Sequence, residues 1–157
     1  MSEVLVAEGR TTRYKGIVPI DRLAEVKVAV IGVGAIGRNL AISLAQMGVR
    51  SIHLIDPDTV DEVNLGPQGY AVDSIGQSKV EATWQDMFTL VGRGETEGFT
   101  KEQSLVEKSH LMDGFSDFWK YDVVFCCVDD IQVRGEIAGW LGKPEFARGG
   151  LFVDGRM

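Results

Sequence analysis

Short apolar runs alternate along the chain with segments of helical periodicity, which predicts strands alternating with helices. Strands are predicted over Lys27–Gly32, Ser51–Asp56, Asp122–Val128 and Leu151–Asp154, with a weaker one over Glu95–Thr100. Helices are predicted over Pro19–Glu25, Ile36–Met47, Ser78–Leu90 and Ile131–Leu141, with broken helix within Gln103–Lys120. This alternation predicts a Rossmann-like, doubly wound α/β fold. We expect a mainly parallel sheet of strand order 3-2-1-4-5 with helices on both faces.

Two of the predicted helices carry apolar stripes that we expect to face the sheet. The stripe of the first consists of Ile36, Leu40, Leu44 and Met47. The stripe of the second consists of Val80, Trp84, Met87 and Val91. The segment 56–76 between these helices is polar and contains prolines and glycines, which predicts a largely irregular loop.

Length and charge narrow the class of protein. The 157 residues suit one nucleotide-binding domain over 1–157, with 1–18 as an irregular arm. The chain stops just after a predicted strand, so we expect a C-terminal part of the fold to be missing. The net charge of −7 does not favour nucleic-acid or membrane-surface binding. No apolar run is long enough for a membrane span, and a cytoplasmic location is expected.

The most informative motif is G-x-G-x-x-G between a predicted strand and a predicted helix. Its glycines are Gly32, Gly34 and Gly37, and Ala35 and Ile36 complete the turn. The first glycine permits a tight turn, the second lets a pyrophosphate approach the backbone, and the third lets helix and strand pack closely. Backbone N–H groups at the helix start then face an anion. The motif predicts nucleotide binding.

Carboxylates follow the predicted strands at the edge where ligands of open parallel sheets bind. Asp56 ends the second strand, roughly 20 residues after the glycines, where it can accept both ribose hydroxyls. Asp58 lies two positions on, Asp129 follows the fourth strand, and Asp154 and Arg156 end the fifth. An acidic edge with scattered cations fits ATP chelated with Mg²⁺ better than a bare dinucleotide.

Further motifs add a resemblance to these features. They are Arg13–Tyr14, GVGAIG, LIDPDTVDEVNL, the glutamine of GPQ, IGQSKVEA and VDDIQVR. The chain resembles the ThiF/MoeB/ubiquitin-activating-enzyme superfamily of ATP-dependent adenylyltransferases from Arg13 to its end. The spacing D-x-D-x-V-x-x-x-N-L and the block G-Q-x-K-V-E are the specific parts of this resemblance.

The resemblance implies a role for each matching residue. Asp56 would hold the ribose, and Asn64 and Gln68 would contact the phosphate region. Lys79 would reach the phosphates, and Asp129 matches the aspartate associated with Mg²⁺. The implied reaction is attack of a carboxylate on the α-phosphorus of ATP, which gives an acyl-adenylate and pyrophosphate. The implied partner is a small ubiquitin-like or sulfur-carrier protein or peptide with a free C-terminus, and the implied assembly is a homodimer.

The chain also departs from the family pattern at two arginine positions. Pro67 replaces the arginine of N-L-x-R-Q, and Gly16 replaces the second arginine of R-Y-x-R-Q. Arg13, Lys15 or Arg156 could replace the missing charge, and we expect Arg156, oriented by Asp154, to do so in part. We therefore assign Arg156, with Lys79 and Asp129, to the catalytic set.

Arg134 matches a helix arginine of the family, although it could instead form only a structural ion pair. The adjacent Cys126 and Cys127 are expected to be buried apolar residues on opposite faces of a strand. A zinc site or thioester cysteine of the family would lie beyond the end of this sequence.

Two other functions remain open. A nicotinamide-dependent oxidoreductase would share the glycines and Asp56 but leave Lys79, Asn64 and Asp129 without a use. A non-catalytic nucleotide-binding protein of the same fold would share every motif, and the two replaced arginines keep this alternative open. The sequence does not choose among carboxylate substrates.

Overall fold

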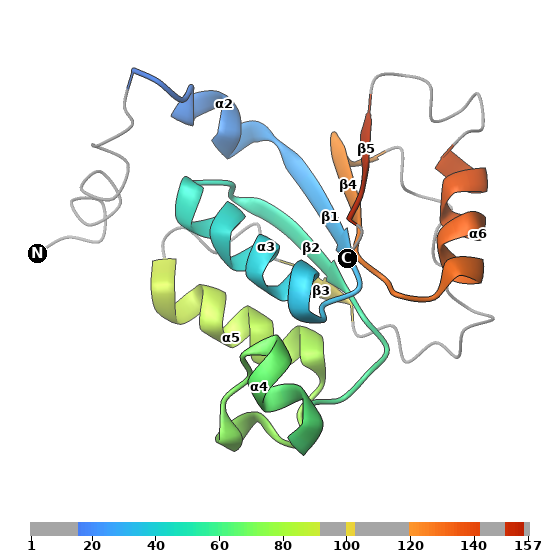
Figure 1. Cartoon of the computed structure of the whole chain (residues 1–157). Helices are drawn as coiled ribbons and strands as arrows, with labels where there is room; N and C mark the ends of the chain where they lie inside the picture. Colours follow the sequence, from blue (N-terminus) through green and yellow to red (C-terminus); the bar gives the residue numbers. More distant parts are fainter. Residues whose placement is uncertain (1–15, 92–99, 103–119, 142–149, 156–157) are drawn as a thin grey trace, which may run out of the picture.

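Five strands form one sheet in the order β3-β2-β1-β4-β5, and every neighbouring pair is parallel. The computed structural model describes residues 16–91, 100–102, 120–141 and 150–155. The strands are β1 (Lys27–Ile31), β2 (Ser51–Ile55), β3 (Thr100–Glu102), β4 (Val123–Cys126) and β5 (Leu151–Asp154). The predicted strand order and fold class are confirmed (Figure 1).

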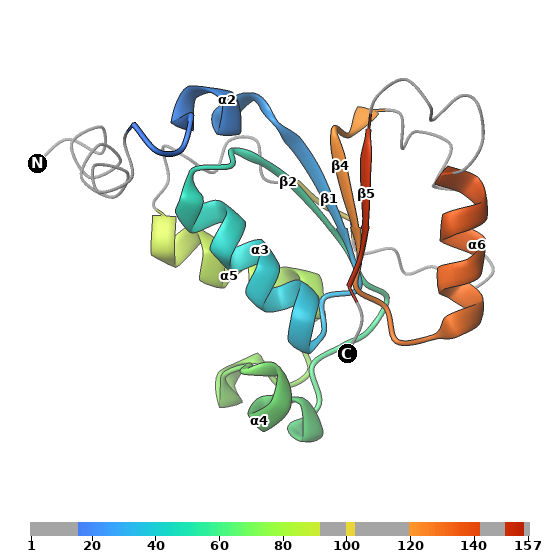
Figure 2. The ribbon, with the colours of Figure 1, turned by 45° about the horizontal axis from the view of Figure 1, so that its top comes forward.

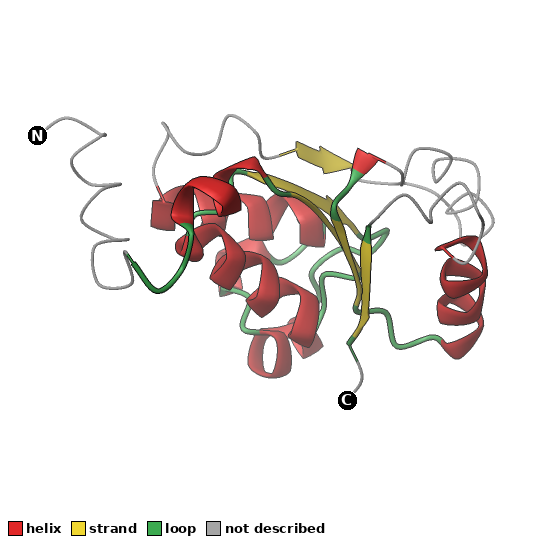
Figure 3. Ribbon diagram, turned by 90° about the horizontal axis from the view of Figure 1, so that it is seen from above, coloured by secondary structure: helices red, strands yellow, loops and turns green. Residues whose placement is uncertain are grey.

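Helices cover both faces of this sheet, as predicted. The helices are α2 (Ile20–Glu25), α3 (Ala35–Met47), α5 (Lys79–Val91) and α6 (Ile131–Leu141), together with the short α4 (Leu65–Gln68). Helices α3 and α5 lie on one face and α6 on the other (Figure 3). Two apolar clusters result, one beneath α3 and α5 around Val30 and Leu54, and one beneath α6 around Ile31 and Val124.

The buried face of α3 differs from the predicted stripe. Its buried residues are Gly37, Arg38, Ala41 and Ala45, whereas Met47 is 42% exposed. Small residues let α3 lie close to the sheet, so the larger Leu40 and Leu44 fall on its flanks, half-buried. The prediction for α5 is largely confirmed, because Val80, Met87 and Val91 are buried and Trp84 packs against the same cluster.

The segment predicted as an irregular loop is built from short turns. The 3₁₀ turns η2 (Glu62–Asn64) and η3 (Val72–Ser74) flank α4. The side chains of Asp61 and Asn64 cap η2 reciprocally. Helix α4 contacts α3 and lies beside its N-terminal end, at the edge of the sheet where the strands finish (Figure 2). The segment therefore sits where a ligand of an open parallel sheet is expected.

Several sequence predictions lie outside the described residues. They concern most of the arm over 1–18, the strand Glu95–Thr100 and the segment Gln103–Lys120 except the last residue of each, and Arg156. No helix in the described ranges has the length and apolarity needed to cross a membrane.

Candidate functional site

The ends of four strands meet at one edge of the sheet. Ile31 at the end of β1 is paired with Ile55 of β2 and with Cys126 of β4, and Cys126 is paired with Asp154 of β5. The residues that follow these strands are therefore neighbours in space although they are far apart in sequence. We call this edge, with the segments that leave it, the carboxyl edge.

The glycine turn passes against the end of β4 and leaves no room for a side chain at Gly32 or Gly37. Gly32 has φ +85°, and a Cβ there would lie 2.8 Å from the carbonyl carbon of Cys127. A Cβ on Gly37 would lie 1.8 Å from the carbonyl oxygen of Gly32. Gly34 is the N-cap of α3, so the first N–H groups of the helix at Ala35 and Ile36 lack intrahelical partners. The turn has the shape and donors of an anion site, as predicted.

Asp56 lies beside this turn as a buried carboxylate, 5% exposed. Its Oδ2 accepts a hydrogen bond from the N–H of Val33 at 2.6 Å, and its Oδ1 accepts one from the N–H of Asp58 at 2.9 Å. Burial raises the pKa of Asp56, while these two hydrogen bonds and the charge of Lys79 act in the opposite direction. Each oxygen keeps a further lone pair, so the carboxylate can still accept from ribose hydroxyls.

Lys79 begins α5 and is directed to the same edge. Its ammonium donates to Oδ2 of Asp58 at 2.9 Å, and its side chain is 9% exposed. The Asp58 side chain is 63% exposed, so one end of this ion pair is open to solvent. An ammonium has three donors, and two of them remain for phosphate oxygens beside Asp58. The structure thus brings together Asp56, Asp58 and Lys79 with the glycine turn.

Asn64 and Gln68 approach the edge from the turns of segment 56–76. The Oδ1 atom of Asn64 accepts from the N–H of Asp61, which leaves its amide nitrogen for a ligand. The amide of Gln68 lies across the middle glycine, 4.0 Å from where a Cβ of Gly34 would stand. Its Oε1 is buried without a hydrogen-bond partner. A buried orphaned oxygen at this position indicates a site that a ligand or water completes.

The two aspartates after β4 have different roles. Asp130 caps α6, because its Oδ1 accepts from the N–H groups of Gln132 and Val133 at 2.8 Å and 3.2 Å. Asp129 is exposed and makes no hydrogen bond within the described part of the chain. In that same part, no cluster of three or more His, Cys, Asp or Glu side chains could hold a metal. Of these two aspartates, Asp129 is the one whose carboxylate is available to a ligand that carries a metal ion.

Arg134 on α6 is a structural brace. Its guanidinium donates to the carbonyl of Val128 after β4, to Oδ1 of Asp154 at 3.0 Å and to the carbonyl of Gly155 at 2.8 Å. It therefore ties the segment carrying Asp129 to the end of β5. Asp154 pairs with Arg134, and the ion pair expected between Asp154 and Arg156 stays a prediction, because Arg156 lies outside the described residues.

The positions of the replaced arginines hold no charge. Pro67 and Gly16 are both exposed.

Cys126 is buried and Cys127 half-buried, and burial raises the pKa of both thiols, that of Cys127 to about 11. Both cysteines are therefore thiols rather than thiolates at neutral pH, in agreement with an apolar role.

Sequence reasoning missed a buried polar cluster that connects α3, α5 and the segment 56–76, which we call the turn segment. Tyr70, 4% exposed, lies under the guanidinium of Arg38, which is 4.9 Å from the ring centroid. Arg38 also pairs with Asp86 of α5 at 2.5 Å. The Tyr70 hydroxyl lies 3.2 Å from the hydroxyl of Thr83. A tyrosine within a polar segment was the one signal available, and no motif contains it.

The chain is similar to several known proteins. Residues 10–145 match the ThiF family. The chain is 31% identical over 140 residues to the adenylyltransferase and sulfurtransferase UBA4 of Lodderomyces elongisporus, covering 87% of this chain and 30% of that protein. It is 30% identical over 124 residues to ubiquitin-like modifier-activating enzyme 5 of Caenorhabditis elegans, covering 73% of this chain and 28% of that protein. The chain thus spans less than a third of either relative.

A solved structure has the same fold. The E. coli tRNA N6-threonylcarbamoyladenosine dehydratase TcdA superposes with a TM-score of 0.78 at 20% identity, over 94% of this chain and 59% of that one. The family match extends over most of the sequence and includes the glycine turn, Asp56, Lys79 and Asp129. The chain belongs to the ThiF family.

Proposed function

We propose that this chain binds ATP at the carboxyl edge and promotes attack of a carboxylate on the α-phosphorus, with release of pyrophosphate. The observation that carries this proposal is the placement of Lys79. It sets an ammonium, 9% exposed at its side chain, beside Asp58 and close enough to Asp56 for its charge to oppose the rise in the pKa of that carboxyl that burial causes. A triphosphate carries more negative charge than the pyrophosphate of a dinucleotide, so it gains more from such a cation.

The residues of the chain act by binding and orientation rather than by covalent chemistry. The glycine turn and the start of α3 present N–H groups to the phosphates. Asp56 accepts the ribose hydroxyls and so fixes the nucleoside end. Lys79 neutralises charge on the phosphates, which lowers the repulsion that an incoming carboxylate meets. Because the carboxylate is itself the nucleophile, positioning of two anions supplies most of the rate.

Asp129 fits a role in holding Mg²⁺. It is exposed at the carboxyl edge and is the free member of the aspartate pair, since Asp130 caps α6. Mg²⁺ usually keeps several waters and binds one or two carboxylates plus substrate phosphates, so a single protein ligand is sufficient. When bound, the ion neutralises charge on the phosphate oxygens.

The relatives suggest the class of the second substrate. One carries the name adenylyltransferase and sulfurtransferase and another ubiquitin-like modifier-activating enzyme. A structural neighbour of 23% identity and TM-score 0.77 was solved in complex with ATP. We extend the proposal to a small ubiquitin-like or sulfur-carrier protein, or a peptide, that offers a free C-terminal carboxylate. We also propose that the full-length protein is a homodimer.

Exchange of labelled pyrophosphate into ATP tests the proposal, using a panel of small proteins and peptides with free C-termini. We expect exchange with at least one of them. Lys79→Ala should lower the exchange rate at least about tenfold, because a charge-assisted hydrogen bond contributes roughly 1.5–3 kcal/mol. Asp129→Ala should do the same.

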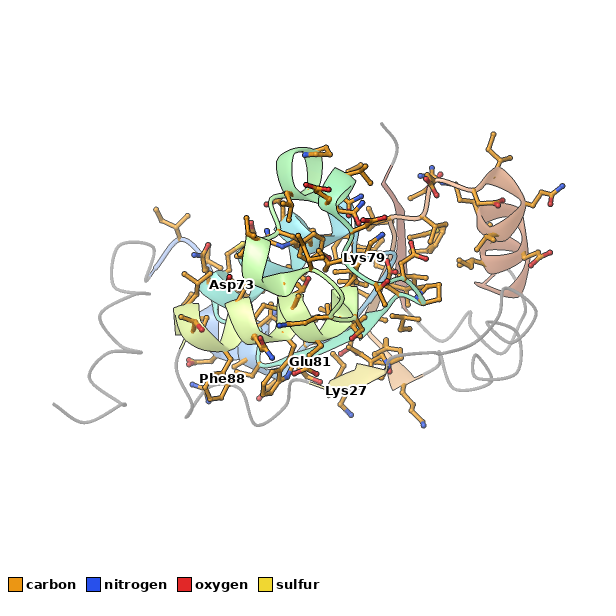
Figure 4. The ribbon with its side chains drawn as sticks, turned by 90° about the horizontal axis from the view of Figure 1, so that it is seen from below. Lys27, Asp73, Lys79, Glu81 and Phe88 are labelled. Carbon is orange, nitrogen blue, oxygen red and sulfur yellow. The ribbon has the colours of Figure 1, made fainter. Side chains whose placement is uncertain are left out.

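Lys27→Ala is the matched control for Lys79→Ala. Lys27 starts β1 and lies well apart from Lys79 (Figure 4). We expect this variant to retain the wild-type exchange rate. Full exchange in the Lys79 and Asp129 variants would refute the mechanism. ATP binding without exchange for any carboxylate would instead favour the non-catalytic alternative.

A further inference from the structure

Both backbone groups of Val33, the residue between the first two glycines of the turn, are held by side chains from elsewhere in the chain. The N–H of Val33 donates to Oδ2 of Asp56 at 2.6 Å. The carbonyl of Val33 accepts from the hydroxyl of Tyr70 at 2.6 Å. Val33 is itself buried, so these bonds are shielded from water. The orientation of the turn therefore depends on Tyr70 as well as on Asp56.

The position of the phenol hydrogen follows from these distances. A phenol has one hydrogen, and the carbonyl of Val33 at 2.6 Å is a much closer acceptor than the carbonyl of Lys79 at 3.5 Å. The hydroxyl of Thr83, 3.2 Å away and fully buried, must then donate to the Tyr70 oxygen. Burial raises the pKa of Tyr70 to about 12, so the phenol remains a donor at neutral pH.

This chain of hydroxyls connects the glycine turn to the helix that carries Lys79. Thr83 lies one turn of α5 beyond Lys79. The Tyr70 ring is in turn held by the guanidinium of Arg38, 4.9 Å from its centroid, and Arg38 is paired with Asp86 of α5. The phenol is thus held by contacts to both α3 and α5, which tie its orientation to these two helices.

The geometry has a direct consequence for the next backbone donor. No peptide bond in the described residues is cis, so the carbonyl of Val33 and the N–H of Gly34 point in opposite directions. By holding that carbonyl, Tyr70 directs the Gly34 N–H away from itself. Gly34 is the N-cap of α3 and is the glycine that a pyrophosphate approaches.

We propose that Tyr70 is a positioning residue for the phosphates: its hydroxyl orients the Val33–Gly34 peptide and keeps the glycine turn in register with Lys79. This inference rests on the proposed binding of ATP. It assigns no contact between Tyr70 and the nucleotide. Its effect is confined to the phosphate end of the ligand, because the nucleoside end is bound by Asp56, on the other side of Val33.

The variant Tyr70→Phe removes the hydroxyl and keeps the ring under Arg38. We expect the Kd for ATP to rise about tenfold, while the Kd for adenosine, which has no phosphates, changes by less than about twofold. Calorimetric titration with both ligands measures this split. A merely structural tyrosine would weaken both ligands equally, and an unchanged Kd for ATP would also overturn the inference.

Two further variants complete the test. Thr83→Val removes the hydroxyl that donates to Tyr70 and keeps a side chain of similar shape. We expect it to raise the Kd for ATP more than the Kd for adenosine, by a smaller factor than Tyr70→Phe does. It carries the test if Tyr70→Phe fails to fold. Tyr121→Phe, just before β4, is the matched control and should leave both affinities unchanged. Wild-type protein that binds no ATP would refute the proposed function itself, which is a separate result.

Discussion

Asp56 directly follows β2 with a carboxylate that water barely reaches, and the protein replaces that water with two backbone donors. The N–H groups of Val33 and Asp58 each bind one of its oxygens. Burial is nevertheless the largest influence, and the pKa of Asp56 is raised. Ionisation of this buried carboxylate lowers the free energy of unfolding. Such a cost is common for residues that serve binding rather than folding.

The pH dependence of stability tests this description. A raised pKa means that the folded protein holds the proton more tightly than the unfolded chain. The contribution of Asp56 to the unfolding free energy therefore falls as pH rises from the ordinary value of 3.8 to the raised value, and is constant above it. Relative to Asp56→Asn, the wild type should lose stability across this window.

Urea unfolding of both proteins at a series of pH values measures the difference. Asp73→Asn, which removes an exposed carboxylate in η3, is the control. A wild type that gains stability over Asp56→Asn as pH rises through the window would show that the hydrogen bonds, not burial, dominate.

The sequence predicted some of these residues and not others, for a physical reason. The glycines and Asp56 could be predicted because each follows the end of a strand, whereas the role of Lys79 was predicted from the resemblance to the ThiF superfamily. Tyr70 could not, because its partners belong to three different elements. Its bond to Val33 depends on how the turn segment folds back over α3, which periodicity does not encode.

At the scale of elements, α3 illustrates a limit of hydrophobic patterns. The predicted stripe consisted of large apolar residues, yet the buried face is built from Gly37, Ala41 and Ala45 with Arg38. Close approach of a helix to a sheet requires small side chains, so the nearest contacts are made by the residues that contribute least to a hydrophobicity count. The bounds of α3 were still predicted to within one residue.

Gly37→Ala tests how tightly α3 is seated. Alanine normally stabilises a helix interior by about 0.5–1 kcal/mol relative to glycine. Here the new Cβ would lie 1.8 Å from the Gly32 carbonyl oxygen, which is backbone and can move only with the turn. We expect the variant to lose about 2 kcal/mol or more of unfolding free energy, as overpacked sites do.

Gly66→Ala in α4 is the comparison for this prediction. A Cβ on Gly66 would meet nothing within 4 Å. Urea unfolding should find it as stable as the wild type or slightly more so. Equal stabilities for the two alanine variants would mean that the turn and α3 can separate without cost.

At the scale of the whole molecule, parallel pairing is what assembles the site. Strands β1, β2, β4 and β5 finish in register, so the residues that follow them share one edge. The sequence predicted this arrangement because the alternation of strands and helices leaves few topologies. The turn segment, the brace of Arg134 and the buried Tyr70 cluster are long-range consequences of that edge, and only the folded chain reveals them.

The residues of the carboxyl edge act together in selecting a nucleotide. A dinucleotide would use the glycine turn and Asp56 but would leave Lys79 and Asp129 without a ligand group. In the proposed function ATP with Mg²⁺ engages all four, so we expect ATP to bind more tightly than NAD⁺ and EDTA to weaken ATP binding. Each charged contact made only by the triphosphate contributes roughly 1.5–3 kcal/mol, which predicts a preference of about tenfold or more.

Calorimetric titrations with ATP and NAD⁺, each with and without EDTA, measure this preference. Lys79→Ala should reduce the ratio of the two affinities by weakening ATP alone, whereas Lys27→Ala, at the opposite end of the sheet, should leave the ratio unchanged. Tighter binding of NAD⁺ than of ATP would overturn the proposed chemistry and favour an oxidoreductase. A preference for ATP that survives in Lys79→Ala would instead separate nucleotide choice from the lysine and place it in the glycine turn and Asp56.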